Sequence, residues 1–134
     1  MKNIVKVRKL KIGEGMHKIC VPLVEKTREG IISVARDLKT IKLDLVEWRV
    51  DYYEYVEDIE KVKETLLKLR EILGDLAILF TFRSLKEGGE KEVSTQYYAK
   101  LNKEVCLTKN IDLIDVELFT GDEVVADIVE YANN

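Results

Sequence analysis

Polar and charged residues alternate with apolar ones toward the carboxyl ends of three apolar segments of this chain. Because side chains in a strand point alternately to opposite faces, the polar residues of each segment share one face. They are Glu47, Arg49 and Asp51 in the first segment, Thr81 and Arg83 in the second, and Asp115 and Glu117 in the third. Arginines facing carboxylates suit a small, anionic, hydroxylated ligand, since a guanidinium can donate two hydrogen bonds to one carboxylate. The pattern therefore predicts a binding site for such a ligand.

Two alternatives to a site for an anion are open. The arginines and carboxylates can form interior salt bridges without a ligand, with Arg49 paired to Glu47 or to Asp115. Carboxylates can also hold a divalent cation and support a metal-assisted lyase, although such a site needs a geometry that sequence does not display. The carboxylates in question are Glu47, Asp51, Asp115 and Glu117. We favour a site with no metal.

The loop after the apolar run Leu76–Phe82 has the composition of a ligand-binding loop. The residues that follow the run are Arg83-Ser84-Leu85-Lys86-Glu87-Gly88-Gly89-Glu90. The glycines allow the backbone to turn where a side chain would clash. Since α/β folds place their sites at the carboxyl ends of parallel strands, we expect this loop to border the site. An ordinary solvated loop is the alternative, and the polar ends of two other segments count against it.

The elements that position these residues are expected to be strands alternating with helices. The strands are predicted at Lys18–Leu23, Leu43–Val50, Leu76–Arg83 and Leu113–Phe119. The helices are predicted over Thr27–Lys39, from an Asp58 cap to Leu73, from Ser94 or Thr95 to Leu107, and after a Thr120–Glu123 capping box. Such alternation implies a parallel sheet with right-handed crossovers. Helices on both faces of a flat sheet would bury the charges, whereas a barrel mouth leaves them accessible, so the pattern favours a barrel.

Local patterns at the two ends of the chain add further expectations. Residues Val5–Ile12 alternate and Gly13–Gly15 supply a turn, so a hairpin into the strand Lys18–Leu23 is predicted. Ile19–Val21 is expected to be a buried strand. The residues of the last helix expected to face inward are Val124, Val125, Ile128 and Val129.

Composition excludes several classes of protein. The 134 residues are 46% hydrophobic and 35% charged with a net charge of −3, which is typical of one soluble globular domain. The sequence has no basic stripe for nucleic acid, no apolar run of membrane-spanning length and no signal-like apolar core. We therefore expect a cytoplasmic protein that binds neither nucleic acid nor membranes. Cys20 and Cys106 have no metal-type spacing and are expected to be buried free thiols.

Three motifs resemble those of type I 3-dehydroquinate dehydratase. They are Val46-Glu47-Trp48-Arg49-Val50-Asp51, the run from Phe80 to Glu90, and Ile114-Asp115-Val116-Glu117-Leu118-Phe119. Their order and spacing match, and the resemblance covers the whole chain. It implies a (β/α)₈ TIM-barrel enzyme of the shikimate pathway. That family converts 3-dehydroquinate to 3-dehydroshikimate and water through a lysine Schiff base, with a histidine as acid and base and without a cofactor.

The resemblance also implies roles for individual residues. Glu47, Arg49 and Arg83 would bind the substrate, and Glu87 would orient the catalytic histidine. Residues that would support these side chains are Asp51, Asp115 and Glu117.

The resemblance implies the amino-terminal half of a barrel. A whole barrel needs about 250 residues, so 1–134 is predicted to be a single domain, with a hairpin region at 1–16 and four βα units at 17–134. The family's Schiff-base lysine and catalytic histidine belong to later strands. Neither His17, at the opposite end of its strand, nor Lys86, in a loop without desolvation, is expected to replace them. The isolated chain is therefore expected to be inactive, as a truncation, a proteolytic fragment or a natural half-barrel that binds a small anion.

An open half-barrel is expected to associate with another chain. Its two outer strands would present unpaired backbone groups, and its inward apolar face would lack cover. The inward apolar residues are Val21, Leu45, Leu79 and Leu113. A two-fold homodimer is the simplest closed arrangement. A matching carboxyl-terminal half would instead complete the site for 3-dehydroquinate.

Overall fold

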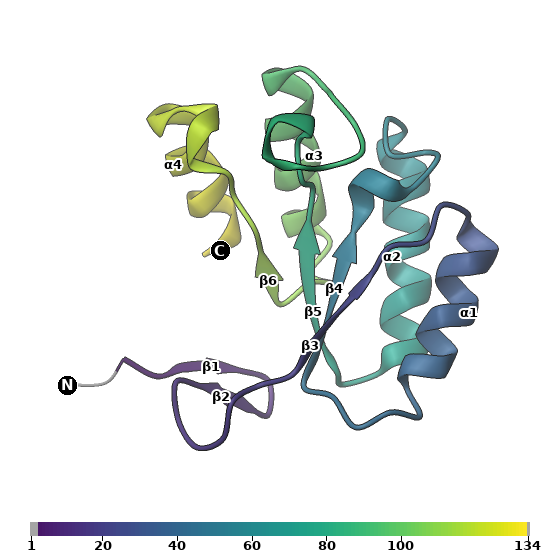
Figure 1. The fold of residues 1–134 in the computed structure, drawn as a ribbon. Helices are drawn as coiled ribbons and strands as arrows, with labels where there is room; N and C mark the ends of the chain where they lie inside the picture. Colours follow the sequence, from purple (N-terminus) through teal and green to yellow (C-terminus); the bar gives the residue numbers. More distant parts are fainter. Residues whose placement is uncertain (1–2, 134) are drawn as a thin grey trace.

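Four parallel strands form the centre of the structure, a computed structural model that describes residues 3–133 (Figure 1). In order across the sheet they are β3 (Cys20–Leu23), β4 (Leu45–Arg49), β5 (Ala77–Thr81) and β6 (Leu113–Ile114). The helices that follow them are α1 (Arg28–Leu38), α2 (Ile59–Leu73), α3 (Thr95–Leu107) and α4 (Asp122–Ala132). All four helices lie on one side of the sheet (Figure 1). Consecutive parallel strands covered by helices on one side form an arc of a barrel, which confirms the predicted fold class.

Three of these helices begin where the sequence predicts. Thr27, Asp58 and Ser94 are the N-caps, and each side chain accepts a hydrogen bond from a backbone N–H three residues later, at 3.0, 3.3 and 3.1 Å. Each such cap stabilises its helix by about 1 kcal/mol. Gly74 ends α2 with a φ of +60°, a conformation that favours glycine. No helix within residues 3–133 combines the length and the apolar content that crossing a membrane requires.

The face of the sheet toward the helices forms the main core. Every second side chain of β4 and β5 points to the helices, as the alternation predicts. Trp48 and Phe80 meet edge to face, with ring centroids 5.8 Å apart. The fully buried apolar residues of these two strands and their extensions are Val46, Trp48, Val50, Ile78, Phe80 and Phe82. The polar residues that alternate with them therefore lie on the opposite, inward face.

A two-stranded hairpin precedes the sheet and differs from the predicted one. β1 (Val5–Val7) pairs antiparallel with β2 (Leu10–Ile12), and the two residues between them form the turn. The chain does turn at Gly13–Gly15, where both glycines have a positive φ, but the predicted pairing with Lys18–Leu23 is wrong. The hairpin closes earlier because its backbone groups are satisfied within residues 5–12, which leaves 13–19 as a connection to β3.

The hairpin covers the amino-terminal end of the inward face. Val7 packs with Leu45 and Ala77, and all three are buried. Leu79 and Leu113 pack against the same small cluster. Three of the residues expected to lack cover thus receive it from the chain's own amino terminus.

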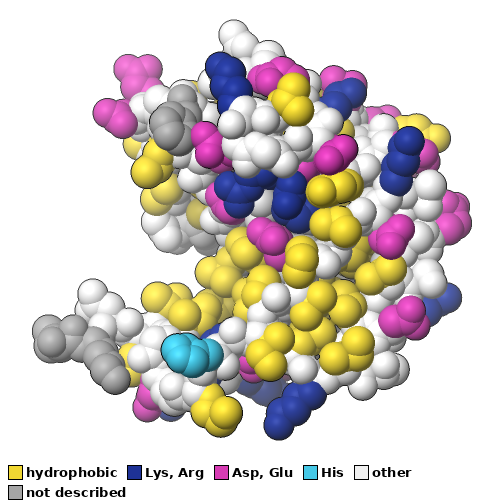
Figure 2. Space-filling view, in the orientation of Figure 1, with side chains coloured by type: hydrophobic (Ala, Val, Ile, Leu, Met, Phe, Trp, Pro, Cys, Tyr) yellow, Lys and Arg dark blue, Asp and Glu magenta, His cyan; other side chains and the backbone are white. Residues whose placement is uncertain are grey.

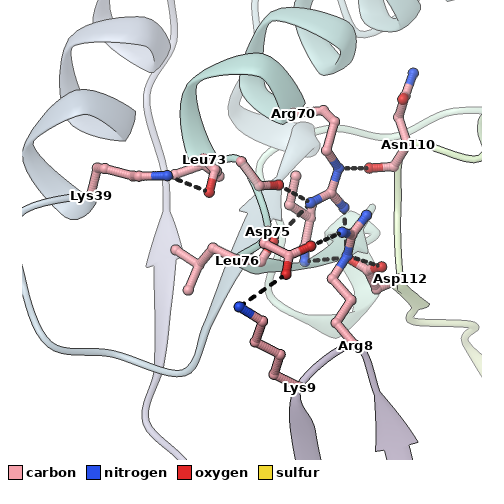
Figure 3. Close-up of polar contacts among 11 residues, drawn as sticks. Arg8, Lys9, Lys39, Arg70, Leu73, Asp75, Leu76, Asn110 and Asp112 are labelled. Carbon is pink, nitrogen blue, oxygen red and sulfur yellow. Dashed lines mark hydrogen bonds and ion pairs between the residues drawn. The ribbon is translucent and has the colours of Figure 1, made fainter.

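Polar contacts tie this hairpin to the sheet (Figure 3). Arg8, at the turn, donates from Nε to Asp112 Oδ1 at 2.6 Å and from Nη1 to Asp75 Oδ1 at 2.7 Å. Asp112 Oδ2 accepts from Arg70 Nη2 at 2.6 Å and from the Ile78 N–H at 2.9 Å. Asp112 therefore joins the hairpin to α2 and to β5.

The carboxyl-terminal part differs from the predicted strand and cap. β6 is two residues long, and beyond its end the Glu117 N–H donates to the Tyr98 hydroxyl at 2.9 Å and not to β5. Thr120 ends a short 3₁₀ helix, η3 (Leu118–Thr120), and its Oγ1 donates to the Glu117 carbonyl at 2.7 Å. Gly121 is the N-cap of α4 and makes no side-chain hydrogen bond. The predicted capping box is therefore wrong, since its hydroxyl is used one turn earlier.

The outer elements are more exposed than predicted. Cys20 is exposed and Ile19 is 53% exposed, so the expected burial of this segment is wrong: β3 is an edge strand of the described sheet. Cys106 is buried, and both thiols are free, as expected. In α4, Ile128 is buried but Val129 is 42% exposed, because α4 is the last helix of the arc and packs mainly against α3.

Candidate functional site

The inward face becomes polar at the carboxyl ends of β4 and β5. Glu47, Arg49, Thr81 and Arg83 lie there, and Asp115, just after β6, joins them through a contact to Arg83. Figure 2 shows the same division on the surface, with basic and acidic side chains gathered above a broad hydrophobic area. The structure thus brings together polar residues from all three predicted segments.

Glu47 is held by the neighbouring strand. Its Oε2 accepts a hydrogen bond of 2.8 Å from Oγ1 of Thr81, whose side chain is fully buried. Within residues 3–133, Oε1 of Glu47 accepts from no protein group. A carboxylate with one oxygen engaged can accept from a ligand hydroxyl with the other.

Arg49 is paired with Asp51 in a bidentate geometry. Nε donates to Oδ1 at 2.9 Å and Nη2 donates to Oδ2 at 2.8 Å. Tyr52, in the short 3₁₀ helix η1 (Val50–Tyr52), lies against the guanidinium, with 5.1 Å from Cζ to the ring centroid. The hydrogen bonds to Asp51 raise the pKa of Arg49 above its ordinary value. Arg49 is therefore a permanent, oriented cation beside Glu47.

Arg83 makes a looser pair with Asp115. Nη2 donates to Oδ2 at 2.7 Å, and the two side chains are 30% and 27% exposed. Ion pairs therefore do occur at this site. Their partners are not those considered from the sequence, since Arg49 pairs with Asp51 and not with Glu47 or Asp115.

The loop after β5 is folded tightly around its two glycines. It contains the 3₁₀ helix η2 (Leu85–Glu87), and Gly88 follows in the left-handed region with a φ of +87°. Gly89 is buried, and a Cβ at this position would lie 1.8 Å from the Arg83 carbonyl oxygen. Both glycines therefore let the backbone turn where a side chain would be strained or would clash, as the sequence predicts. Glu87 is exposed at the end of η2.

Glu117 supports the start of this loop. Its carboxylate accepts from the Ser84 N–H at 3.1 Å and from Ser84 Oγ at 3.2 Å, and the side chain is buried. Burial raises the pKa of the neighbouring Tyr98 to about 12. A cavity of about 310 Å³ lies beside these groups and is lined in part by Lys86 and Glu87.

The carboxylates considered for a divalent cation have protein donors instead. Glu47 accepts from Thr81, Asp115 from Arg83, and Glu117 from Ser84, while Asp51 pairs with Arg49. In the part of the chain that the structure describes, no group of three or more His, Cys, Asp or Glu side chains has the arrangement of a metal site. The metal-assisted alternative gains no support from this geometry.

Two contributors to the site carried no signal in the sequence. The Tyr98 hydroxyl, on α3, accepts from the backbone N–H of Glu117, and no sequence pattern indicates this contact. Ser84 was expected only as a loop residue. His17, before β3, and Lys86, in η2, are both exposed.

Comparisons with known proteins agree with these motifs. The family model of type I 3-dehydroquinase matches residues 19–134. The 3-dehydroquinate dehydratase of Clostridium botulinum is 57% identical over 134 residues, which are 100% of this chain and 53% of that protein. That of Clostridioides difficile is 53% identical over 133 residues, which are 99% of this chain and 52% of that protein. The chain spans about half the length of the curated relatives it matches.

Solved structures lead to the same family. A type I 3-dehydroquinate dehydratase from Clostridium difficile, with covalently modified comenic acid, superposes with a TM-score of 0.98 at 53% identity, over 99% of this chain and 52% of that one. The 3-dehydroquinate dehydratase of Geobacillus kaustophilus superposes with a TM-score of 0.93 at 33% identity, over 99% of this chain and 53% of that one. Since the motifs, the arc of βα units and these similarities agree, the chain belongs to the type I 3-dehydroquinase family.

Proposed function

We propose that this chain is the amino-terminal, substrate-binding half of a type I 3-dehydroquinate dehydratase. The complete enzyme would be a lyase of the shikimate pathway that converts 3-dehydroquinate to 3-dehydroshikimate and water. The observation that carries the proposal is the placement of two guanidinium groups, Arg49 from β4 and Arg83 from the end of β5, at one mouth beside Glu47. This arrangement suits an anionic, hydroxylated ligand.

Each site residue has a proposed role. Arg49 and Arg83 bind the substrate through charge-assisted hydrogen bonds, and Glu47 accepts from a substrate hydroxyl. Asp51, Asp115 and Glu117 support these groups. Glu87, exposed at the site's border, orients a histidine that a carboxyl-terminal half supplies, and no cofactor takes part.

Catalysis then needs groups from the carboxyl-terminal half. In this family a lysine forms an imine with the substrate ketone, which acidifies the neighbouring C–H so that water can leave. We assign neither the lysine nor the histidine to this chain, because Lys86 and His17 are exposed. This chain binds and orients, and its partner performs the proton transfers.

Borohydride trapping tests this division of roles. The chain alone should neither dehydrate 3-dehydroquinate nor form a borohydride-stable adduct, whereas both activities should appear when the carboxyl-terminal half of a relative is added. Arg83→Ala should then weaken substrate binding, and Glu87→Gln should mainly slow turnover. An adduct on a lysine of this chain would overturn the assignment, as would equal and negligible effects of the two substitutions.

We also propose that the isolated chain pairs with a second copy across its open side. The edge strands β3 and β6 and the exposed Ile19 support this arrangement. The two free thiols are consistent with the reducing cytoplasm, where we place the protein. Sedimentation equilibrium decides the oligomeric state. A single folded species of 15.5 kDa at high concentration would exclude the homodimer.

A further inference from the structure

One carboxylate at the mouth is completely shielded from solvent. The Asp51 side chain has no exposed surface. Besides the two bonds from Arg49, its Oδ2 accepts from the Glu90 N–H at 3.0 Å, and its Oδ1 has a longer contact of 3.4 Å with the Arg83 N–H. These four donors use the acceptor capacity of the carboxylate. Asp51 therefore has no free acceptor site for a ligand, and it can affect ligand binding only through the residues that it contacts.

The first neighbour is the guanidinium of Arg49. Asp51 occupies the edge formed by Nε and Nη2, while Nη1 donates to no protein group of residues 3–133. The ring of Tyr52 lies against the same group. A guanidinium fixed on one edge and one face loses little rotamer freedom when a ligand binds. Asp51 thus determines which edge of Arg49 is presented to the ligand.

The second neighbour is the loop that carries Glu87. Arg83 begins this loop and Glu90 ends it, so the two backbone N–H groups that contact Asp51 come from its opposite ends. Inside the loop, the Gly89 N–H donates to the Ser84 carbonyl at 2.8 Å. One carboxylate of β4's extension therefore closes the loop of β5 and joins it to Arg49.

We infer that Asp51 is a positioning residue that sets the direction of Arg49 and the position of the Arg83–Glu90 loop without touching the ligand. The identity of the ligand rests on the proposed function, but the geometry does not. Asp115 differs from Asp51, because its side chain is 27% exposed and accepts one hydrogen bond from Arg83. An incoming anion can replace Asp115, whereas it cannot reach Asp51.

Arginine Nε–H NMR of the 134-residue chain tests the geometry without a ligand. The Arg49 Nε–H should exchange with water at least about tenfold more slowly than that of Arg28, which is exposed on α1. In Asp51→Asn, which keeps the shape but turns an amide donor toward other donors, this protection should be lost. Asp75→Asn removes the same charge at the opposite end of the sheet and should leave the Arg49 signal unchanged. If Asp51→Asn does not fold, the exchange rates of the Arg49 and Arg28 Nε–H groups in the wild type still show whether Asp51 holds the Arg49 guanidinium.

Titration with 3-dehydroquinate supplies a second readout. Asp51→Asn should bind about tenfold more weakly than the wild type, as expected when one charge-assisted hydrogen bond is misdirected. Asp75→Asn should bind as the wild type does. Equal affinity of Asp51→Asn and wild type, or an Arg49 Nε–H that exchanges as fast as that of Arg28, would overturn the inference. If the wild type binds no 3-dehydroquinate, the proposed function fails, and the NMR comparison alone decides the role of Asp51.

Discussion

Substituting Asn for Asp112 should release the hairpin from the sheet (Figure 3). Asp112 is 11% exposed and accepts from Arg8, from Arg70 and from the N–H of Ile78. Asparagine has the same shape, but it has one acceptor oxygen and carries no charge. Arg70, whose side chain is only 13% exposed, would then lack its carboxylate partner.

The magnitude follows from these contacts. Hydrogen bonds to charged groups are each worth about 1.5–3 kcal/mol, and breaking a fully buried ion pair costs about 3–5 kcal/mol. The pair here retains some contact with water, and Arg70 keeps its bonds to the carbonyls of Gly74, Leu76 and Asn110. We therefore expect a loss of about 2.5 kcal/mol. With an unfolding entropy of about 2.1 cal/mol/K per residue, the 134 residues would show a Tm lower by about 9 °C.

Thermal and urea unfolding followed by circular dichroism measure this loss. Asp75→Asn is the matched control, because it removes the same charge from a side chain that is 60% exposed and should change stability much less. The reasoning is refuted if Asp112→Asn and Asp75→Asn have the same Tm. Protease resistance of residues 5–12 gives an independent check, since the hairpin should be cut first in Asp112→Asn.

Two further predictions concern the loop and the carboxyl-terminal segment. Gly89→Ala should lower Tm more than Gly88→Ala. A Cβ at position 89 would lie 1.8 Å from the Arg83 carbonyl oxygen, whereas a Cβ at position 88 would meet no atom and would be strained only by the left-handed φ. The reverse ranking of the two Tm values would contradict the loop geometry. Burial raises the pKa of Tyr98 from 10 to about 12, so the folded state favours the protonated phenol. The resulting contribution to the free energy of unfolding is complete below pH 10 and is lost as pH rises through 12. Tyr98→Phe should therefore lose less stability than the wild type between pH 10 and pH 12 in urea unfolding, and equal losses would show that the Tyr98 phenol is not the group responsible.

Much of the fold could be predicted because its signals are local. Alternation along β4 and β5 separates buried Trp48 and Phe80 from polar Glu47 and Thr81, since strand geometry repeats every two residues. Caps such as Asp58 act within one turn of their helix. Gly89 could be assigned to a tight loop because two adjacent glycines follow an apolar strand.

Which carboxylate pairs with which arginine could not be predicted, because alternation leaves several possible partners on the same face. Alternation placed Arg49 and Arg83 on the same polar face as Asp51 and Asp115. Only the structure shows that Asp51 pairs with Arg49 and Asp115 with Arg83. The Tyr98 hydroxyl, from α3, accepts the Glu117 N–H, a contact between residues far apart in the sequence that the predicted strand Leu113–Phe119 did not include.

The sequence by itself therefore determined the order of strands and helices, the polar mouth and the family motifs, because each depends on residues close together in the chain. Only the tertiary structure decided how the hairpin closes, where β6 ends and which carboxylate holds which arginine. For Asp51 and Glu90 the chain must bring together groups 39 residues apart. Such a contact depends on the packing of β4 against β5, which no local pattern encodes.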